Sequence, residues 1–168
     1  ALMRSVLVHI VNKQPAISEI YRILKPGGKF CAFEPIIRSN TRYWEIVDPM
    51  HVEKYEDFKR VENELMENPL DSLCNFDQDT LRTNLEIAGF SIPEVKVQEV
   101  RSNYVVQAGM VEPWFNNPPS PGQPSTKERY LKYFDEATID KYIKQVQNYL
   151  TGREISLKSN AVFINATK

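Results

Sequence analysis

The spacing of apolar residues along the chain predicts alternating helices and strands. A helix over residues 13–25 has one apolar face, made of residues three or four positions apart: Ile17, Ile20, Tyr21 and Leu24. Residues 29–34 include four consecutive apolar residues, which is typical of a strand buried on both faces. Between these elements, Gly27 and Gly28 are expected to reverse the chain by adopting positive φ. A helix that leads into a buried strand is half of a crossover unit in a doubly wound α/β sheet.

The remainder of the chain predicts two further strands separated by helical segments. Val95 and Val97 alternate with polar residues in a strand expected at 94–106, and the final strand is expected at 155–167. The high density of proline over residues 112–124 predicts a stiff loop that excludes both helix and sheet. Helical periodicity is present in three other segments, which are 50–66, 77–88 and, in two pieces, 125–150.

Capping residues mark where several of these helices begin and end. Asp77 is expected to cap the N-terminus of one helix, and Gly89 to end it. Ser125 and Glu128 have the spacing of a capping box, in which each side chain bonds the other residue's backbone N–H. Asp135 is expected to restart this helical segment after a break.

One stretch resembles a known family. The segment R-I-L-K-P-G-G-K-F (Arg22–Phe30), followed by Glu34 and Pro35, resembles the helix–turn–strand of Rossmann-like (class I) S-adenosylmethionine (SAM)-dependent methyltransferases. Arg4–Ile10 is similar to the segment that leaves the family's fourth strand. The family's strand order is 3-2-1-4-5-7-6, with strand 7 antiparallel. The resemblance implies a partial doubly wound sheet of strands 5-7-6 with a stub of strand 4, flanked by helices.

The glycine-rich loop that follows the family's first strand has no counterpart here. The six glycines of the chain form no G-x-G pattern. We therefore expect residues 1–168 to be the C-terminal part of a single methyltransferase domain. A segment at about 107–153 is expected to be a helical insertion that resembles a substrate lid. The resemblance implies SAM as the cofactor of the longer protein, and the isolated fragment is expected to be inactive.

Composition and charge narrow the classes of partner. The net charge is −1, with both signs interspersed along the 168 residues, so no basic surface for nucleic acid is expected. Every apolar run is far shorter than the roughly 20 residues that a membrane-spanning helix requires. Cys31 and Cys74 lie in different predicted environments, which favours reduced thiols and a cytoplasmic protein over a disulfide.

The candidate cofactor and catalytic residues follow from the topology. Open α/β sheets bind ligands at the carboxyl ends of their strands, which selects Met3, Arg4 and Ser5 as cofactor-binding candidates. The resemblance implies that SAM contacts the backbone near Met3 and Arg4. Glu34 and His9 are candidates for a general base. The alternatives are a strand-end carboxylate in water for Glu34 and a partly buried structural histidine for His9.

Aromatic residues supply the candidate substrate site. Four of them lie in the two segments that the family uses as a lid: Tyr43, Trp44, Trp114 and Phe115. Aromatic side chains in irregular segments often line pockets for small molecules, although they can also anchor such segments to the core. Asp48, His51 and Glu53 do not have the spacing of a helical ligand pair, so we expect no metal site.

Methyl transfer from a sulfonium is an in-line displacement that requires alignment of the acceptor more than a nucleophile. The leading hypothesis is therefore the C-terminal part of a SAM-dependent methyltransferase acting on a small molecule. The alternative is a non-catalytic interaction or dimerisation module that keeps half of the fold. A nucleotide-binding Rossmann protein is disfavoured by R-I-L-K-P-G-G. The unpaired edge expected beside strand 29–34 predicts a homodimer or larger assembly through residues 1–36.

Overall fold

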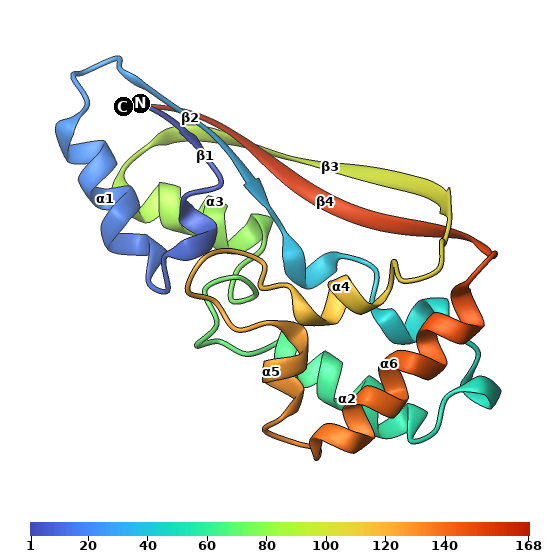
Figure 1. Cartoon of the computed structure of the whole chain (residues 1–168). Helices are drawn as coiled ribbons and strands as arrows, with labels where there is room; N and C mark the ends of the chain where they lie inside the picture. Colours follow the sequence, from blue (N-terminus) through green and yellow to red (C-terminus); the bar gives the residue numbers. More distant parts are fainter. The chain divides into compact units, whose positions relative to one another are not determined.

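The computed structural model describes all residues from Ala1 to Lys168, which form two compact units. The first unit comprises residues 1–40, 66–101 and 158–168, and the second comprises residues 41–65 and 102–157. Figure 1 shows the order of the helices and strands along the chain. No helix is both long enough and apolar enough to cross a membrane.

Most of the sheet lies in the first unit. Its strands are β1 (Leu2–Arg4), β2 (Lys29–Pro35), β3 (Ser91–Val105) and β4 (Glu154–Thr167), in the order β1-β2-β4-β3. β1 is parallel to β2, with Arg4 opposite Phe33, and β4 is antiparallel to β2. This order and these directions confirm the predicted α/β sheet, in which a stub of strand 4 is followed by 5, 7 and 6.

Two helices cover one face of this sheet (Figure 1). They are α1 (Lys13–Ile23) and α3 (Gln78–Ala88), and they pack against each other. The core of the unit contains fully buried side chains from both helices, β2 and the connecting segments: Leu7, Ile17, Phe30, Phe76, Leu81 and Leu85. Phe163 of β4 is 44% exposed. Within this unit, no helix covers the opposite face of the sheet.

The ends of α3 confirm two capping predictions. Asp77 Oδ1 accepts a hydrogen bond from the backbone N–H of Thr80 at 2.8 Å, and this satisfies one unpaired donor in the first turn. Gly89 follows the helix with φ of +100°, in the left-handed conformation that favours glycine. Short 3₁₀ helices η1 (Leu7–His9) and η2 (Ile37–Ser39) follow β1 and β2.

The turn between α1 and β2 differs from the prediction at Gly28. Gly27 has φ of +77°, as predicted, but Gly28 is not among the residues with positive φ. Glycine is needed at Gly28 for a steric reason instead, because a Cβ atom there would lie 2.8 Å from the carbonyl oxygen of Lys25. The prediction of positive φ at Gly28 was therefore wrong, although the turn itself forms.

Replacing Gly28 with alanine is expected to destabilise the fold by roughly 1–3 kcal/mol, because the new methyl group must displace backbone atoms. Urea denaturation followed by circular dichroism measures this change. The neighbouring exposed residue gives the control Lys29→Ala, for which we expect a change within about 0.5 kcal/mol. An equal urea midpoint for Gly28→Ala and the parent chain would contradict the steric role.

Both cysteines belong to the first unit. Cys31 is partly buried in β2, and Cys74 is buried in the segment between α2 and α3. The Sγ atom of Cys74 lies 3.6 Å from the Sδ atom of Met66. Neither cysteine forms a disulfide.

The second unit is helical. Its elements are η3 (Tyr43–Ile46), η4 (Pro49–His51), α2 (Tyr55–Met66), α4 (Glu112–Asn116), α5 (Thr126–Tyr130) and α6 (Glu136–Leu150). Ser125 and Glu128 form the predicted capping box of α5. Asp135 caps α6, accepting the backbone N–H of Thr138 at 2.8 Å. The unit includes the whole of segment 107–153, which was predicted as an insertion, together with residues 41–65.

The helix α4 corrects one prediction. It lies inside the segment 112–124, which the proline density had predicted to exclude helix. Pro113 occupies the first turn of α4, where a proline removes no hydrogen bond because the first N–H groups of a helix have no partner. Phe115 is fully buried and fastens this short helix to the core of the unit.

Candidate functional site

The three candidate cofactor-binding residues lie together where β1 ends. Met3 is partly buried and Arg4 is exposed in β1, and Ser5 follows them. Ser5 has φ of +52°, and its backbone N–H donates to the carbonyl oxygen of Phe33 at 2.8 Å. A non-glycine residue in this conformation is uncommon and is held there by its surroundings, often at functional sites.

Glu34 lies against the segment that follows β1 and is fully buried. Its Oε1 atom accepts the backbone N–H groups of Val6 and Leu7, and its Oε2 atom accepts that of Val8, each at 3.0 Å. The carboxylate thus binds the N-terminus of η1, where backbone donors lack helical partners and the helix dipole favours negative charge. The geometry supports a structural role, since no atom of Glu34 is open to a dissolved substrate.

His9 is the candidate base that stays accessible. It is exposed at the end of η1, the short helix whose first N–H groups bind Glu34. A general base must come within hydrogen-bond distance of the proton it removes, and the exposed imidazole of His9 is open to such a contact. The structure therefore brings Ser5 and His9 to the same exit segment of β1.

Lys13 is a buried charged residue that sequence reasoning missed. Its Nζ atom donates to Ile10 O at 2.9 Å, to Ser72 O at 3.2 Å and to Asn75 Oδ1 at 2.6 Å. It also lies 4.2 Å from the centre of the Phe76 ring. Burial lowers the pKa of this amine to about 8, partly offset by nearby carboxylates such as Glu34. Lys13 therefore ties the segment before α3 to the start of α1.

This lowered pKa predicts a pH-dependent stability. Between the folded pKa of about 8 and the ordinary value of 10.5, the unfolded chain binds more protons at Lys13 than the folded chain does. The contribution of Lys13 to the free energy of unfolding should therefore rise with pH across this window and fall as pH drops through about 8. Urea midpoints from pH 7 to 10 should show this rise in the parent chain and lose it in Lys13→Met.

The control for this measurement is Lys25→Met, which removes an exposed lysine at the other end of the same segment. It should keep the parent pH profile. Identical profiles for the parent chain and Lys13→Met would show that the buried amine does not titrate in this range.

Three of the four candidate substrate-binding residues meet in the second unit. The rings of Tyr43 and Trp114 are parallel within 6° at a centroid distance of 6.3 Å, and Tyr43 lies 4.4 Å from Phe115. The Tyr43 hydroxyl donates to the carbonyl oxygen of Trp114 at 3.1 Å. Burial raises the pKa of Tyr43 to about 12, so this residue is a neutral hydrogen-bonding group near neutral pH.

Trp44 lies in a different environment from the other three aromatic residues. Its indole Nε1 donates to Asn63 Oδ1 at 3.2 Å, and the Nζ atom of Lys59 lies 4.7 Å from its ring centre. These contacts fasten η3 to α2. Trp44 therefore does not join the other three aromatic residues.

The aromatic cluster extends further than the sequence indicated. Phe58 of α2 stacks on Tyr142 of α6 at a centroid distance of 3.7 Å, and Phe115 packs edge to face on Tyr142 at 5.8 Å. Tyr130 of α5 joins them, 5.4 Å from Phe58. Phe58, Tyr130 and Tyr142 lie on three separate helices, and only tertiary contact brings their rings into one cluster.

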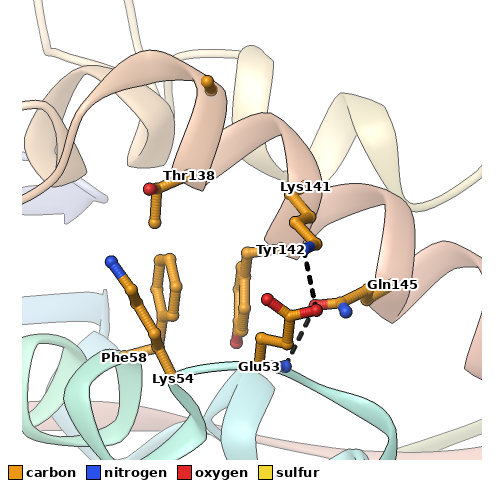
Figure 2. A pocket seen from close by; sticks show the side chains of 8 residues that line it. Glu53, Lys54, Phe58, Thr138, Lys141, Tyr142 and Gln145 are labelled. Carbon is orange, nitrogen blue, oxygen red and sulfur yellow. Dashed lines mark hydrogen bonds and ion pairs between the residues drawn. The ribbon is translucent and has the colours of Figure 1, made fainter.

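A cavity of about 230 Å³ lies against this cluster (Figure 2). Phe58 and Tyr142 form its aromatic wall, and the remaining lining is mostly polar: Glu53, Lys54, Ala137, Thr138, Lys141 and Gln145. Glu53 pairs with Lys141 at 2.7 Å, and its backbone N–H donates to Gln145 Oε1 at 3.0 Å. The cavity therefore combines an aromatic surface with charged groups of both signs.

Comparison with known proteins gives similarity to solved structures alone. No protein-family model matches the chain, and no curated protein matches it. Phosphoethanolamine N-methyltransferase 2 from Haemonchus contortus is similar in two structures, at 17% identity with a TM-score of 0.43 and at 18% with 0.42. A candidate methyltransferase from Bacillus halodurans C-125 is similar at 17% identity, with a TM-score of 0.44.

These similarities extend over 99% of this chain. The chain is similar to methyltransferases. It spans 32% of the length of the Haemonchus protein and 62% of the Bacillus protein. One Haemonchus structure holds phosphomonomethylethanolamine and S-adenosylhomocysteine, and the other holds SAM.

Proposed function

We propose that this chain is the C-terminal part of a SAM-dependent methyltransferase that acts on a small molecule. The observation that carries the proposal is the sheet, in which antiparallel β4 is inserted between β2 and β3, beside the parallel pair of β1 and β2. This is the strand order that the R-I-L-K-P-G-G segment led us to expect. Most open α/β sheets are entirely parallel near their centre, so one inserted antiparallel strand is a specific feature.

The residues at the end of β1 fit a cofactor site in part. Met3 and Arg4 lie at the carboxyl end of β1, which is where open α/β sheets bind their ligands. Ser5 turns the chain away there in a left-handed conformation. SAM supplies an activated methyl group on a sulfonium. Met3, Arg4 and Ser5 would hold part of this cofactor, and a glycine-rich loop that this sequence lacks would hold the rest.

The chain's own residues would then bind and orient the acceptor. Tyr43 and Trp114, which are partly exposed, offer aromatic faces for a small molecule, and the fully buried Phe115 supports Tyr43 from the core. Orientation of the acceptor is the main requirement of methyl transfer. Trp44 would act indirectly by holding η3 on α2. His9 would accept a proton where the acceptor carries one. Glu34 would act indirectly, by holding η1 and so positioning the segment that follows β1.

The alternative proposal is a non-catalytic interaction module that keeps half of the fold. It is favoured by the absence of any G-x-G pattern among the six glycines. The two proposals predict different behaviour of the gene's complete product. A methyltransferase requires a glycine-rich loop between a strand and a helix in the sequence before Ala1, whereas an interaction module does not.

Calorimetric titration with SAM tests the proposal in two stages. The 168-residue chain alone should give no saturable micromolar binding, because it lacks the loop. The complete gene product should bind SAM and, with a panel of small-molecule acceptors, release S-adenosylhomocysteine. A complete product that neither binds SAM nor forms S-adenosylhomocysteine would favour the interaction module.

A further inference from the structure

Two buried glutamates perform the same structural task in the two units. Glu34 binds the N-terminus of η1, and Glu62 of α2 binds the N-terminus of η3 by accepting the backbone N–H of Tyr43 on Oε1 at 3.0 Å. Glu62 is 3% exposed. Both oxygens of Glu34 are hydrogen bonded, whereas Oε2 of Glu62 has no hydrogen-bond partner. Capping of η3 therefore explains only one of the two Glu62 oxygens.

Two tyrosine hydroxyls in the same unit are also unpartnered. Tyr130 and Tyr142 are 0% and 1% exposed, and neither hydroxyl has a hydrogen-bond partner. Their rings are 6.3 Å apart. Burial raises the pKa of each hydroxyl, and the negative charge of Glu62 raises it further. Folded proteins leave few buried polar atoms unsatisfied, and a bound water or ion is one cause of such a group.

The surroundings of these three atoms are aromatic. Phe58 stacks on Tyr142, and Phe115 lies against both tyrosines at 5.8 and 6.2 Å. A carboxylate among aromatic faces is the environment that recognises an organic cation, through a charge-assisted hydrogen bond and cation–π attraction. An ammonium group with three N–H donors matches three unpartnered oxygens that can each accept one bond.

We propose that Glu62, Tyr130 and Tyr142 form a binding site for a primary alkylammonium ion. The ion donates one hydrogen bond to Glu62 Oε2 and one to each tyrosine oxygen, with its alkyl group on the aromatic rings. Phe58 and Tyr142 of this cluster also line the cavity in Figure 2. The site lies within the helical unit, so it does not depend on methyl transfer.

The charged groups around Glu62 set the pH at which the site binds. Burial raises the pKa of the Glu62 carboxyl to about 7, opposed by the backbone N–H of Tyr43 and the charge of Arg42. Glu45 adds a smaller effect that raises it further. The ionised carboxylate is the form that attracts a cation, so the affinity for an alkylammonium ion should be about tenfold higher at pH 8 than at pH 6.

Methylammonium is the probe, and saturation-transfer NMR on the 168-residue chain measures its binding without SAM. We expect saturable binding that is stronger at pH 8 than at pH 6. Tetramethylammonium has no N–H donor, and should bind at least about tenfold more weakly because the hydrogen bonds to a charged group are lost. Both comparisons use the parent chain, so they do not depend on whether a variant folds.

Substitutions locate the site. Glu62→Gln should weaken methylammonium binding at pH 8 by at least about tenfold and remove its pH dependence, and Tyr142→Phe should weaken it as well. The matched controls are Glu64→Gln, in the surface pair with Arg60 on α2, and Tyr133→Phe, which is 44% exposed. Both should bind like the parent chain. The proposal is overturned if methylammonium does not bind saturably, if tetramethylammonium binds equally well, or if Glu62→Gln keeps the parent affinity.

Discussion

Replacing Glu34 with alanine is expected to lower the free energy of unfolding by roughly 3–5 kcal/mol, a large fraction of the total stability of an ordinary domain. The loss leaves the buried backbone N–H groups of Val6, Leu7 and Val8 without acceptors. Urea denaturation measures it. Glu34→Gln should lose less, because its amide oxygen can still accept the N–H groups of Val6 and Leu7.

The control is Glu19→Ala, which breaks an exposed pair with Arg22 and should leave the urea midpoint close to that of the parent chain. The comparison also separates the two interpretations of Glu34. A structural cap predicts a large loss of stability, whereas a catalytic carboxylate predicts a folded, inactive protein. Parent-like stability for Glu34→Ala would remove the capping explanation.

The 168-residue chain is expected to form a homodimer or larger assembly through residues 1–36. β1 is the edge of the sheet, and Leu2 on it is 85% exposed. An apolar edge strand pairs readily with another chain, and a charged residue on the edge prevents this. Light scattering should give at least twice the chain mass of 19.5 kDa. Leu2→Lys should shift the mass toward that of one chain.

The matched control is Ile92→Lys, which places the same charge on a 93% exposed residue of β3, at the opposite edge of the sheet. This variant should keep the mass of the parent assembly. A single-chain mass for the parent protein at high concentration would refute the prediction. If both variants dissociate the assembly equally, the prediction that the interface lies at β1 is wrong.

The strand order was predictable from sequence because local signals specify it. The apolar face of α1, the glycine turn and the apolar run of β2 follow one another within a few residues, and they resemble a family whose topology is distinctive. The caps Asp77, Ser125 and Asp135 were predictable for the same reason, since each acts on a backbone N–H three residues away.

The buried charged groups were not predictable, because their partners are distant in sequence. Glu34 binds residues 26 to 28 positions earlier, and Lys13 binds Asn75, which is 62 positions later. Only the fold brings these atoms together. Composition gives no signal for such contacts, so sequence analysis did not single out Lys13 and left Glu34 as a candidate base or a strand-end carboxylate in water. The error at α4 has a local cause, since proline opposes a helix everywhere except its first turn.

The positions of the two cysteines allow thiol labelling to follow one of the two units alone. The chain has two cysteines, and both lie in the first unit, so the helical unit carries no thiol. The buried Cys74 can react with a thiol reagent only when the segment around it opens, whereas Cys31 is partly exposed. In a Cys31→Ser background, the rate of labelling at Cys74 would therefore report fluctuations of the sheet-containing unit alone. Such kinetics offer a direct record of how often that unit opens in its native state.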